Sequence, residues 1–225
     1  MAWTLIWSGL FITGYLGWQL FVTDLFNRGV QTAAQSDLAV TIGESEPAAE
    51  QIDSSDFFGG ETPPGFPESV QLVSEPQPEP GEAMAFIRIP RIGIDQVVFS
   101  GVDLQTLKSG PGHMPRTPLP GQPGNTVISG HRTTHGRPFF DLDQLATGDR
   151  IEVENQSGIH RYEIREILVV KPTDVWVTRE RPGGWLTLTT CNPKFSARER
   201  LIIVAEMVGG PNLDYILLQQ LKPDS

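Results

Sequence analysis

Seven short apolar runs, separated by turn residues, constrain the fold of this chain more than any other feature. They are residues 85–89, 93–99, 125–129, 150–154, 161–170, 185–190 and 201–208. Runs of this kind, bounded by glycine and proline, are typical of β-strands. Only residues 103–108, with Asp103 as N-cap, and residues 140–145 suggest helical turns, and residues 110–124 are expected to form a loop. The pattern therefore predicts a mainly β fold, either a barrel or a sandwich.

The chain contains one cysteine, Cys191, so no intrachain disulfide can form and the fold must depend on its core. Cys191 ends the alternating run at residues 185–190, and Asn192 and Pro193 follow it. A side chain at such a strand end can reach a cleft. Position alone leaves two interpretations open, because a lone cysteine is either a small buried hydrophobic residue or a reactive thiol.

His131 is the candidate base for a reactive thiol, since it follows the strand predicted at residues 125–129. A cysteine needs a nearby base or cation to populate its thiolate, and an imidazole could later donate a proton to a leaving amine. A lone histidine in a loop is more often a polar surface residue. Three others compete for the role: His113, His135 and His160.

Arg200 opens the last predicted strand, where a guanidinium could stabilise an oxyanion or hold a substrate carbonyl. The alternative is a solvated cation paired with Glu199. Arg198 competes directly, because alternation along a strand would place Arg198 and Arg200 on the same face.

Residues 1–26 are predicted to form a transmembrane anchor, because Met1 to Thr23 carries no charged side chain. Trp3, Trp7 and Trp18 suit a membrane interface. A cleaved signal peptide is the alternative, with residues 32–34 as the cleavage site. The anchor is favoured because the apolar run exceeds a signal core of about 7–15 residues and no basic residue precedes it.

Residues 27–82 are predicted to be a disordered, acidic, proline-rich linker. Between Gly29 and Ile87 there are eleven Asp and Glu and no Lys or Arg, whereas residues 83–209 are nearly neutral. The overall net charge of −10 argues against nucleic-acid binding. Three aromatic residues in the linker are either solvated or dock as a lid: Phe57, Phe58 and Phe66.

No set of residues in the sequence predicts a metal or cofactor site. Asp141 and Asp143 are acidic neighbours, but no oxygen-rich loop of the calcium-binding type surrounds them. No glycine-rich phosphate loop follows a strand. The C-terminal tail, residues 210–225, is expected to form a short apolar helix over residues 213–221 or to be disordered.

The ordered motifs between residues 83 and 208 resemble the sortase family. They are Ile87-Arg-Ile-Pro-Arg-Ile-Gly-Ile94, Gly-Pro-Gly-His113, Pro120-Gly-Gln-Pro-Gly-Asn125, Ser-Gly-His131-Arg, Gly148-Asp-Arg, Leu186-Thr-Leu-Thr-Thr-Cys191 and Arg200-Leu-Ile-Ile-Val-Ala205. The resemblance implies that residues 83–209 form a closed β-barrel of about eight strands with short helices. It also implies a cysteine transpeptidase, with Cys191 as nucleophile, His131 as acid or base, and Arg200 at the oxyanion or the signal peptide.

The same resemblance implies the substrates. The enzyme would cleave a C-terminal sorting signal between Thr and Gly and join the secreted protein, through a thioester, to the amine of a lipid-linked peptidoglycan precursor. Substrate-binding positions implied in this way are Thr190, Arg132 and His135. No cofactor is implied, and the expected location is the cell membrane, single-pass, with the catalytic domain extracellular.

The stretch from Thr189 to Arg200 looks most like class E sortases, whose signal resembles Leu-Ala-x-Thr-Gly. That class tends to carry Tyr four residues beyond the histidine, and this chain has His135 there. Two alternatives remain: a pilin-polymerising sortase, which a lid over Cys191 would favour, and a non-catalytic envelope-binding barrel with a sealed cysteine.

Overall fold

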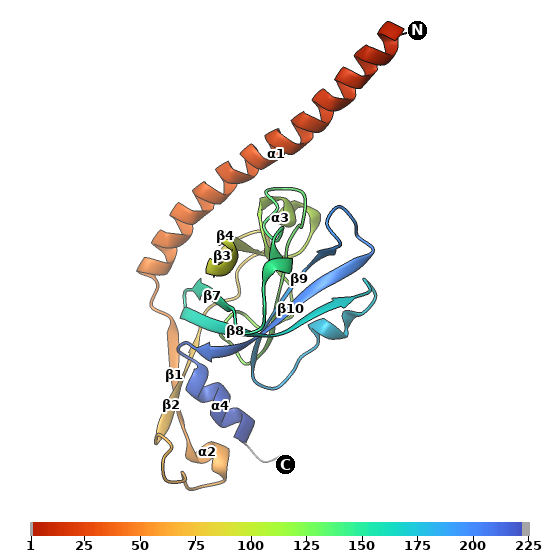
Figure 1. Ribbon diagram of the computed structural model, residues 1–225. Coiled ribbons are helices and arrows are strands. Elements are labelled where there is room, and N and C mark those ends of the chain that lie inside the picture. The colour runs from red at the N-terminus through yellow and green to blue at the C-terminus, as the bar shows by residue number, and fades with distance from the viewer. Residues whose placement is uncertain (1, 222–225) are drawn as a thin grey trace.

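Eight strands close into a barrel in the computed structural model, which describes residues 2–221 (Figure 1). Their order around the barrel is β10-β8-β7-β3-β4-β5-β6-β9. The strands are β3 (Ala83–Ile89), β4 (Ile94–Ser100), β5 (Gly112–His113), β6 (Gly124–Ser129), β7 (Arg150–Asn155), β8 (Gly158–Val170), β9 (Gly184–Asn192) and β10 (Glu199–Gly209). The predicted closed, mainly β barrel is confirmed. β5 was missed, because two residues inside a glycine- and proline-rich loop carry no strand pattern.

The C-terminal ends of β6 and β9 lie at the same edge of the barrel. β6 pairs with β9 in parallel, with Ser129 opposite Thr189. The carboxyl ends of parallel strands lie at the same edge of a sheet. Because His131 follows β6 and Cys191 lies near the end of β9, the topology brings these two residues to the same rim.

The barrel interior is filled by large aliphatic side chains. The fully buried residues include Ile87, Ile89, Ile128, Ile151, Ile164, Leu186, Leu188 and Ile203. These residues come from six different strands. Their burial is the main stabilising contribution, since the chain has no disulfide.

Short helices lie between the barrel strands, and one more follows the last strand. They are η1 (Pro90–Ile92), α3 (Leu104–Ser109), η2 (Leu142–Gln144), η3 (Val175–Thr178) and α4 (Leu213–Leu221). The predicted N-cap is confirmed, because the Asp103 carboxylate accepts hydrogen bonds from the backbone of Gln105 and Thr106. The expected turn at residues 140–145 is the single 3₁₀ turn η2. Of the two alternatives for the tail, a short helix or disorder, the structure has the helix α4.

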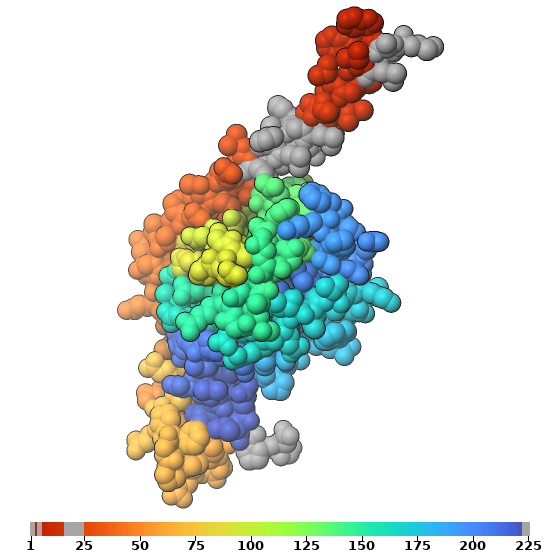
Figure 2. Space-filling model, in the orientation of Figure 1, coloured from red at the N-terminus to blue at the C-terminus, as the bar shows by residue number. Residues whose placement is uncertain are grey.

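The N-terminal segment is a long helix, α1 (Ala2–Glu44), which runs past the barrel and extends beyond it (Figures 1 and 2). Among the residues whose side chains the structure describes, no helix is both long and apolar enough to cross a membrane. The anchor predicted over residues 1–26 falls partly on residues 1, 2, 4, 5 and 16–24, which lie outside that described set.

The prediction of a disordered linker over residues 27–82 is wrong. The second half of α1 packs on the barrel, and a hairpin of β1 (Ala48–Asp53) and β2 (Ser69–Ser74) follows it, with α2 (Ser55–Phe58) between the strands. Figure 2 shows the hairpin and α4 projecting together from one end of the barrel. The acidic composition concealed a one-sided apolar pattern that is buried here, at Leu38, Phe57, Val70 and Val73.

The three linker aromatic residues do not form a lid over Cys191. Phe57 is buried and packs edge-to-face on Tyr215 at 5.5 Å, and Phe58 contacts Phe66 at 5.2 Å between ring centroids. They dock at the hairpin and α4, away from the cysteine rim.

Candidate functional site

The loop that carries His131 is tied directly to the strand that carries Cys191. The backbone amide of Gly130 donates to Thr189 O at 3.1 Å, and the Thr190 hydroxyl donates to Gly130 O at 2.8 Å. A Cβ at residue 130 would lie 2.6 Å from the buried ring of Phe139, so only glycine fits without displacement. These contacts fix where the chain leaves β6 and therefore where His131 begins.

Cys191 and His131 line one open groove of about 350 Å³. The other lining residues are Arg132, Thr133, Thr134, Phe195, Ser196 and Ala197. The Cys191 side chain is partly exposed, so the thiol is not sealed in the core. This geometry argues against the interpretation of Cys191 as an inert core residue.

Arg200 lies directly opposite Cys191 in the antiparallel β9–β10 pair. Directly opposite residues place their side chains on the same face, with Cβ atoms about 4.5–5.5 Å apart. The Arg200 guanidinium donates to Ala197 O at 3.1 Å and to Glu199 O at 2.9 Å, so it is held beside Ala197, which lines the groove, although Arg200 is not itself a lining residue. Arg198 precedes β10 in a bend and is exposed, so the strand alternation expected to place it beside Arg200 does not apply.

His131 is half-buried and stacks on His135. The two ring centroids are 4.9 Å apart, with an interplanar angle of 30°. Burial lowers the pKa of His131, and electrostatic repulsion from the neighbouring His135 lowers it further. His131 is therefore mainly the neutral imidazole at neutral pH, the form that can accept a proton from a thiol. His135 adopts a left-handed backbone conformation, with φ of 51°.

Arg132, predicted to bind substrate, has its guanidinium directed into the protein. Its side chain is only 2% exposed and bonds to Asp143 at 3.0 Å. It also donates to Phe140 O at 3.2 Å, to Cys191 O at 3.2 Å and to Asn192 Oδ1 at 3.0 Å. These contacts join the loop after His131 to the end of β9, which suits a positioning role better than direct contact with substrate.

Lys194 and two carboxylates lie next to Arg132, and the sequence analysis did not identify this cluster. Lys194 Nζ lies 3.3 Å from both Asp141 and Asp143, and 4.1 Å from the centroid of the Phe140 ring. Burial alone would raise the pKa of Asp143, but the hydrogen bond from Lys194 and the charges of Arg132 and Lys194 lower it overall. The anionic carboxylate is thus favoured beneath Arg132. No signal marked Lys194, because its partners lie about fifty residues away in sequence.

The other predicted candidates are engaged elsewhere. The Thr190 hydroxyl is used in the bond to Gly130 and is buried. His113 is buried against Pro118 O at 3.0 Å, and His160 lies in a buried network with Asn155 and Ser157. Among the described residues, no three His, Cys, Asp or Glu side chains are grouped as metal ligands would be.

The site therefore combines a partly exposed thiol, a neutral imidazole in the same groove, and a guanidinium on the facing strand. A thiol with an adjacent base can attack a carbonyl carbon, and a cation at the rim can stabilise the oxyanion that forms. This arrangement can support acyl transfer through a thioester.

Known proteins share both the sequence and the fold. Sortase SrtE1 of Streptomyces coelicolor is 33% identical over 146 residues, which cover 58% of this chain and 42% of that protein. Sortase D of Bacillus subtilis is 29% identical over 209 residues, which cover 91% of this chain and 96% of that protein. The crystal structure of Sortase E1 from Streptomyces coelicolor with a tripeptide in the active site aligns at 32% identity with a TM-score of 0.55, covering 59% of this chain and 93% of that chain.

The family model of the Sortase domain matches residues 87–208. That region runs from β3 to β10 and includes Cys191, His131 and Arg200. The matched region is more than half of the chain. The alignment with SrtE1 spans less than half of that longer protein. The chain belongs to the sortase family.

Proposed function

We propose that this chain is a cysteine transpeptidase that cleaves a sorting signal between Thr and Gly and transfers the acyl part to an amine. The observation that carries the proposal is the groove in which Cys191 lies with His131, with Arg200 opposite on β10. Membership of the sortase family supports the same chemistry.

The reaction has two steps, acylation of Cys191 and transfer of the acyl group to the amine. Cys191 Sγ, its proton taken by His131, attacks the Thr carbonyl carbon, and Arg200 stabilises the oxyanion. The C–N bond to Gly breaks, a thioester forms, and His131 gives its proton to the leaving amine. In the second step the acceptor amine attacks the thioester, a new amide forms, and the proton released by the amine returns through His131 to the thiolate.

We further propose a Leu-Ala-x-Thr-Gly signal and the amine of a lipid-linked cell-wall precursor as acceptor, supported by likeness to class E relatives. An extracellular catalytic domain held at the membrane by the N-terminal segment suits such an acceptor. The uncharged N-terminal sequence and the exposed Trp3, Trp7 and Phe11 support this location.

An acyl-transfer assay tests the proposal. The full chain is incubated with Leu-Ala-x-Thr-Gly and Leu-Pro-x-Thr-Gly peptides and with several amines, including the Lys side chain of a pilin-type acceptor. Faster transfer from the first peptide to a precursor amine supports the proposal. Transfer only to the Lys acceptor would instead indicate pilin polymerisation, although none of the described residues from the linker lines the groove. Full transfer by Cys191→Ala would refute the assigned nucleophile.

A further inference from the structure

The second half of α1 presents one stripe of residues to the barrel. Two buried side-chain amides lie at the N-terminal end of this stripe. The stripe consists of Asn27, Gln31, Ala34, Leu38 and Ile42, at helical spacing of three and four. Leu38 packs on Phe86, Val97 and Phe99. Asn27 and Gln31 are only 4% and 5% exposed. Buried amides on an otherwise apolar stripe must have specific hydrogen-bond partners.

Gln31 takes the place of a neighbouring strand. Its side-chain oxygen accepts from the Val97 amide at 2.8 Å, and its nitrogen donates to Val97 O at 3.2 Å and Ser109 O at 2.8 Å. This edge of β4 pairs with β5 only at Phe99 and Ser100. The amide of Gln31 therefore satisfies backbone groups that the short β5 leaves uncovered.

Asn27 connects two further parts of the barrel. Its Nδ2 donates to Lys108 O at 2.9 Å and to Ser109 O at 3.0 Å, carbonyls at the C-terminal end of α3. Its side-chain oxygen faces Gly136, since a Cβ at residue 136 would lie 2.1 Å from that atom. The loop that carries the candidate base thus lies against α1.

This loop has an unusual backbone where Asn27 meets it. His135 and Gly136 are both left-handed, with φ of 51° and 76°. A non-glycine residue in that conformation costs roughly 1–2 kcal/mol and persists where its surroundings enforce it. His135 in turn stacks on His131. The contacts form a continuous path from α3 through Asn27 and Gly136 to His135 and His131.

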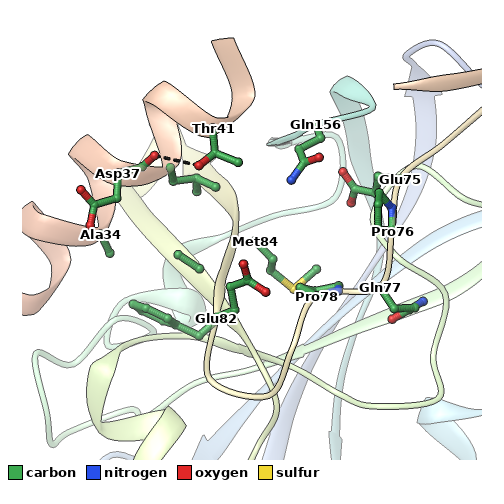
Figure 3. A pocket seen from close by; sticks show the side chains of 13 residues that line it. Ala34, Asp37, Thr41, Glu75, Pro76, Gln77, Pro78, Glu82, Met84 and Gln156 are labelled. Carbon is green, nitrogen blue, oxygen red and sulfur yellow. Dashed lines mark hydrogen bonds between the residues drawn. The ribbon is translucent and has the colours of Figure 1, made fainter. Parts of the chain in front are cut away.

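The part of α1 that follows Gln31 faces another region of the barrel. There Ala34, Asp37, Leu38 and Thr41 line a hollow of about 440 Å³, with Glu82 and Met84 on the barrel side (Figure 3). Among the residues whose side chains the structure describes, Asn27 is the α1 residue placed against Gly136 of the His131 loop.

We propose that Asn27 is a positioning residue for the active site, through which α1 sets the orientation of the His135 stack and hence of His131 beside Cys191. Because this concerns the alignment of a catalytic base, it rests on the proposed function. In this proposal α1 helps to orient the catalytic base in addition to linking the barrel to the N-terminal residues.

The test uses the full chain with Asn27→Leu, which has nearly the same side-chain shape, adds no charge and cannot donate to Lys108 O and Ser109 O. Ser36→Ala is the matched control, since Ser36 is exposed on the same helix and its hydroxyl bonds to Ala33 O within that helix. Two quantities are measured: the rate constant and KM for Cys191 acylation by a Leu-Ala-x-Thr-Gly peptide, and the His131 imidazole titration by NMR, assigned with His131→Gln.

For Asn27→Leu the expected result is a fall of about tenfold in the acylation rate constant, a change in KM of less than about twofold, and a shifted His131 titration midpoint. Ser36→Ala should match the wild type. A lower melting temperature with an unchanged rate constant and His131 titration would overturn the proposal, because that is the result of a purely structural role. If the wild type transfers no acyl group but Asn27→Leu still shifts the His131 titration, the positioning link stands and the proposed function fails.

Discussion

Replacing Arg132 with Met should damage both stability and chemistry, because its guanidinium joins the two halves of the site. The change leaves Cys191 O, Asn192 Oδ1 and Phe140 O without their donor. Each hydrogen bond to a charged group contributes about 1.5–3 kcal/mol, but relaxation and water entry recover part of that. The loss of the Asp143 partner adds less, since that carboxylate is 43% exposed.

The expected decrease in the free energy of unfolding is therefore about 3–5 kcal/mol, which is what remains of three hydrogen bonds to a charged group after this recovery. Most domains have about 5–15 kcal/mol, so the variant should still fold. A displacement of Cys191 by about 1 Å would slow acylation on the order of a hundredfold. Urea denaturation and single-turnover acylation measure the two effects.

Arg88→Met is the matched control. Arg88 also contacts three carboxylates, Asp95, Glu152 and Glu154, but its side chain is 34% exposed and far from the groove. Its loss should cost less than about 1 kcal/mol and leave acylation unchanged. If Arg132→Met unfolds at the same urea concentration as Arg88→Met and acylates like the wild type, the positioning role is wrong.

Three further changes test other parts of the site and fold. Arg200→Ala should lower the acylation rate constant by a factor of about 10²–10³, as loss of an oxyanion donor does, whereas Arg198→Ala should change it little. Equal losses of activity for the two variants in steady-state kinetics would contradict the assignment of Arg200 to the oxyanion. His135→Phe keeps an aromatic ring beside His131 but removes the electrostatic repulsion of His135, so the pKa of His131 should rise and the acid limb of the acylation–pH profile should move to higher pH. An unmoved limb would show that the stack does not control the base. Burial raises the pKa of Glu75 to about 7 despite hydrogen bonds from Ser157 and Asn155. The native state therefore binds more protons than the unfolded state between about pH 4.5 and pH 7, and the wild type should lose about 2 kcal/mol as pH rises through that window. Glu75→Gln should abolish most of this slope in urea denaturation at pH 5.5 and 8.5, and an unchanged slope would refute the role of Glu75.

The barrel was predictable because its strands carry their own signal. Alternation in residues 185–190 and apolar β-branched residues in residues 201–205 predict strands from local sequence alone. The short helix α3 was predictable for the same reason, because its N-cap residue Asp103 is a local signal. The closed eight-strand topology came from resemblance to a family, since local pattern could not distinguish a barrel from a sandwich.

The fold of residues 27–82 was not predictable from composition. Acidic residues and prolines dominate the segment, but a few apolar side chains such as Leu38 and Val73 are enough to dock it on the barrel and α4. Gln31 and Asn27 are polar residues whose partners are backbone groups about 66–82 residues away. No sequence pattern reports such contacts.

The site was partly predictable. Cys191 and His131 share a groove as expected, and register places Arg200 opposite Cys191. Arg132 was assigned to substrate because the motif marks its position but not the direction of its side chain. That direction depends on Asp143 and Asn192, which only the folded chain brings together.

Intact-mass measurement of the full chain with a Leu-Ala-x-Thr-Gly peptide, in the absence of an acceptor amine, tests the central claim most directly. The account predicts a mass increase equal to the acyl fragment, located on Cys191, removed by hydroxylamine and absent in Cys191→Ala. The same adduct on Cys191→Ala, or cleavage of the peptide by that variant at the wild-type rate, would contradict the claim that Cys191 is the nucleophile.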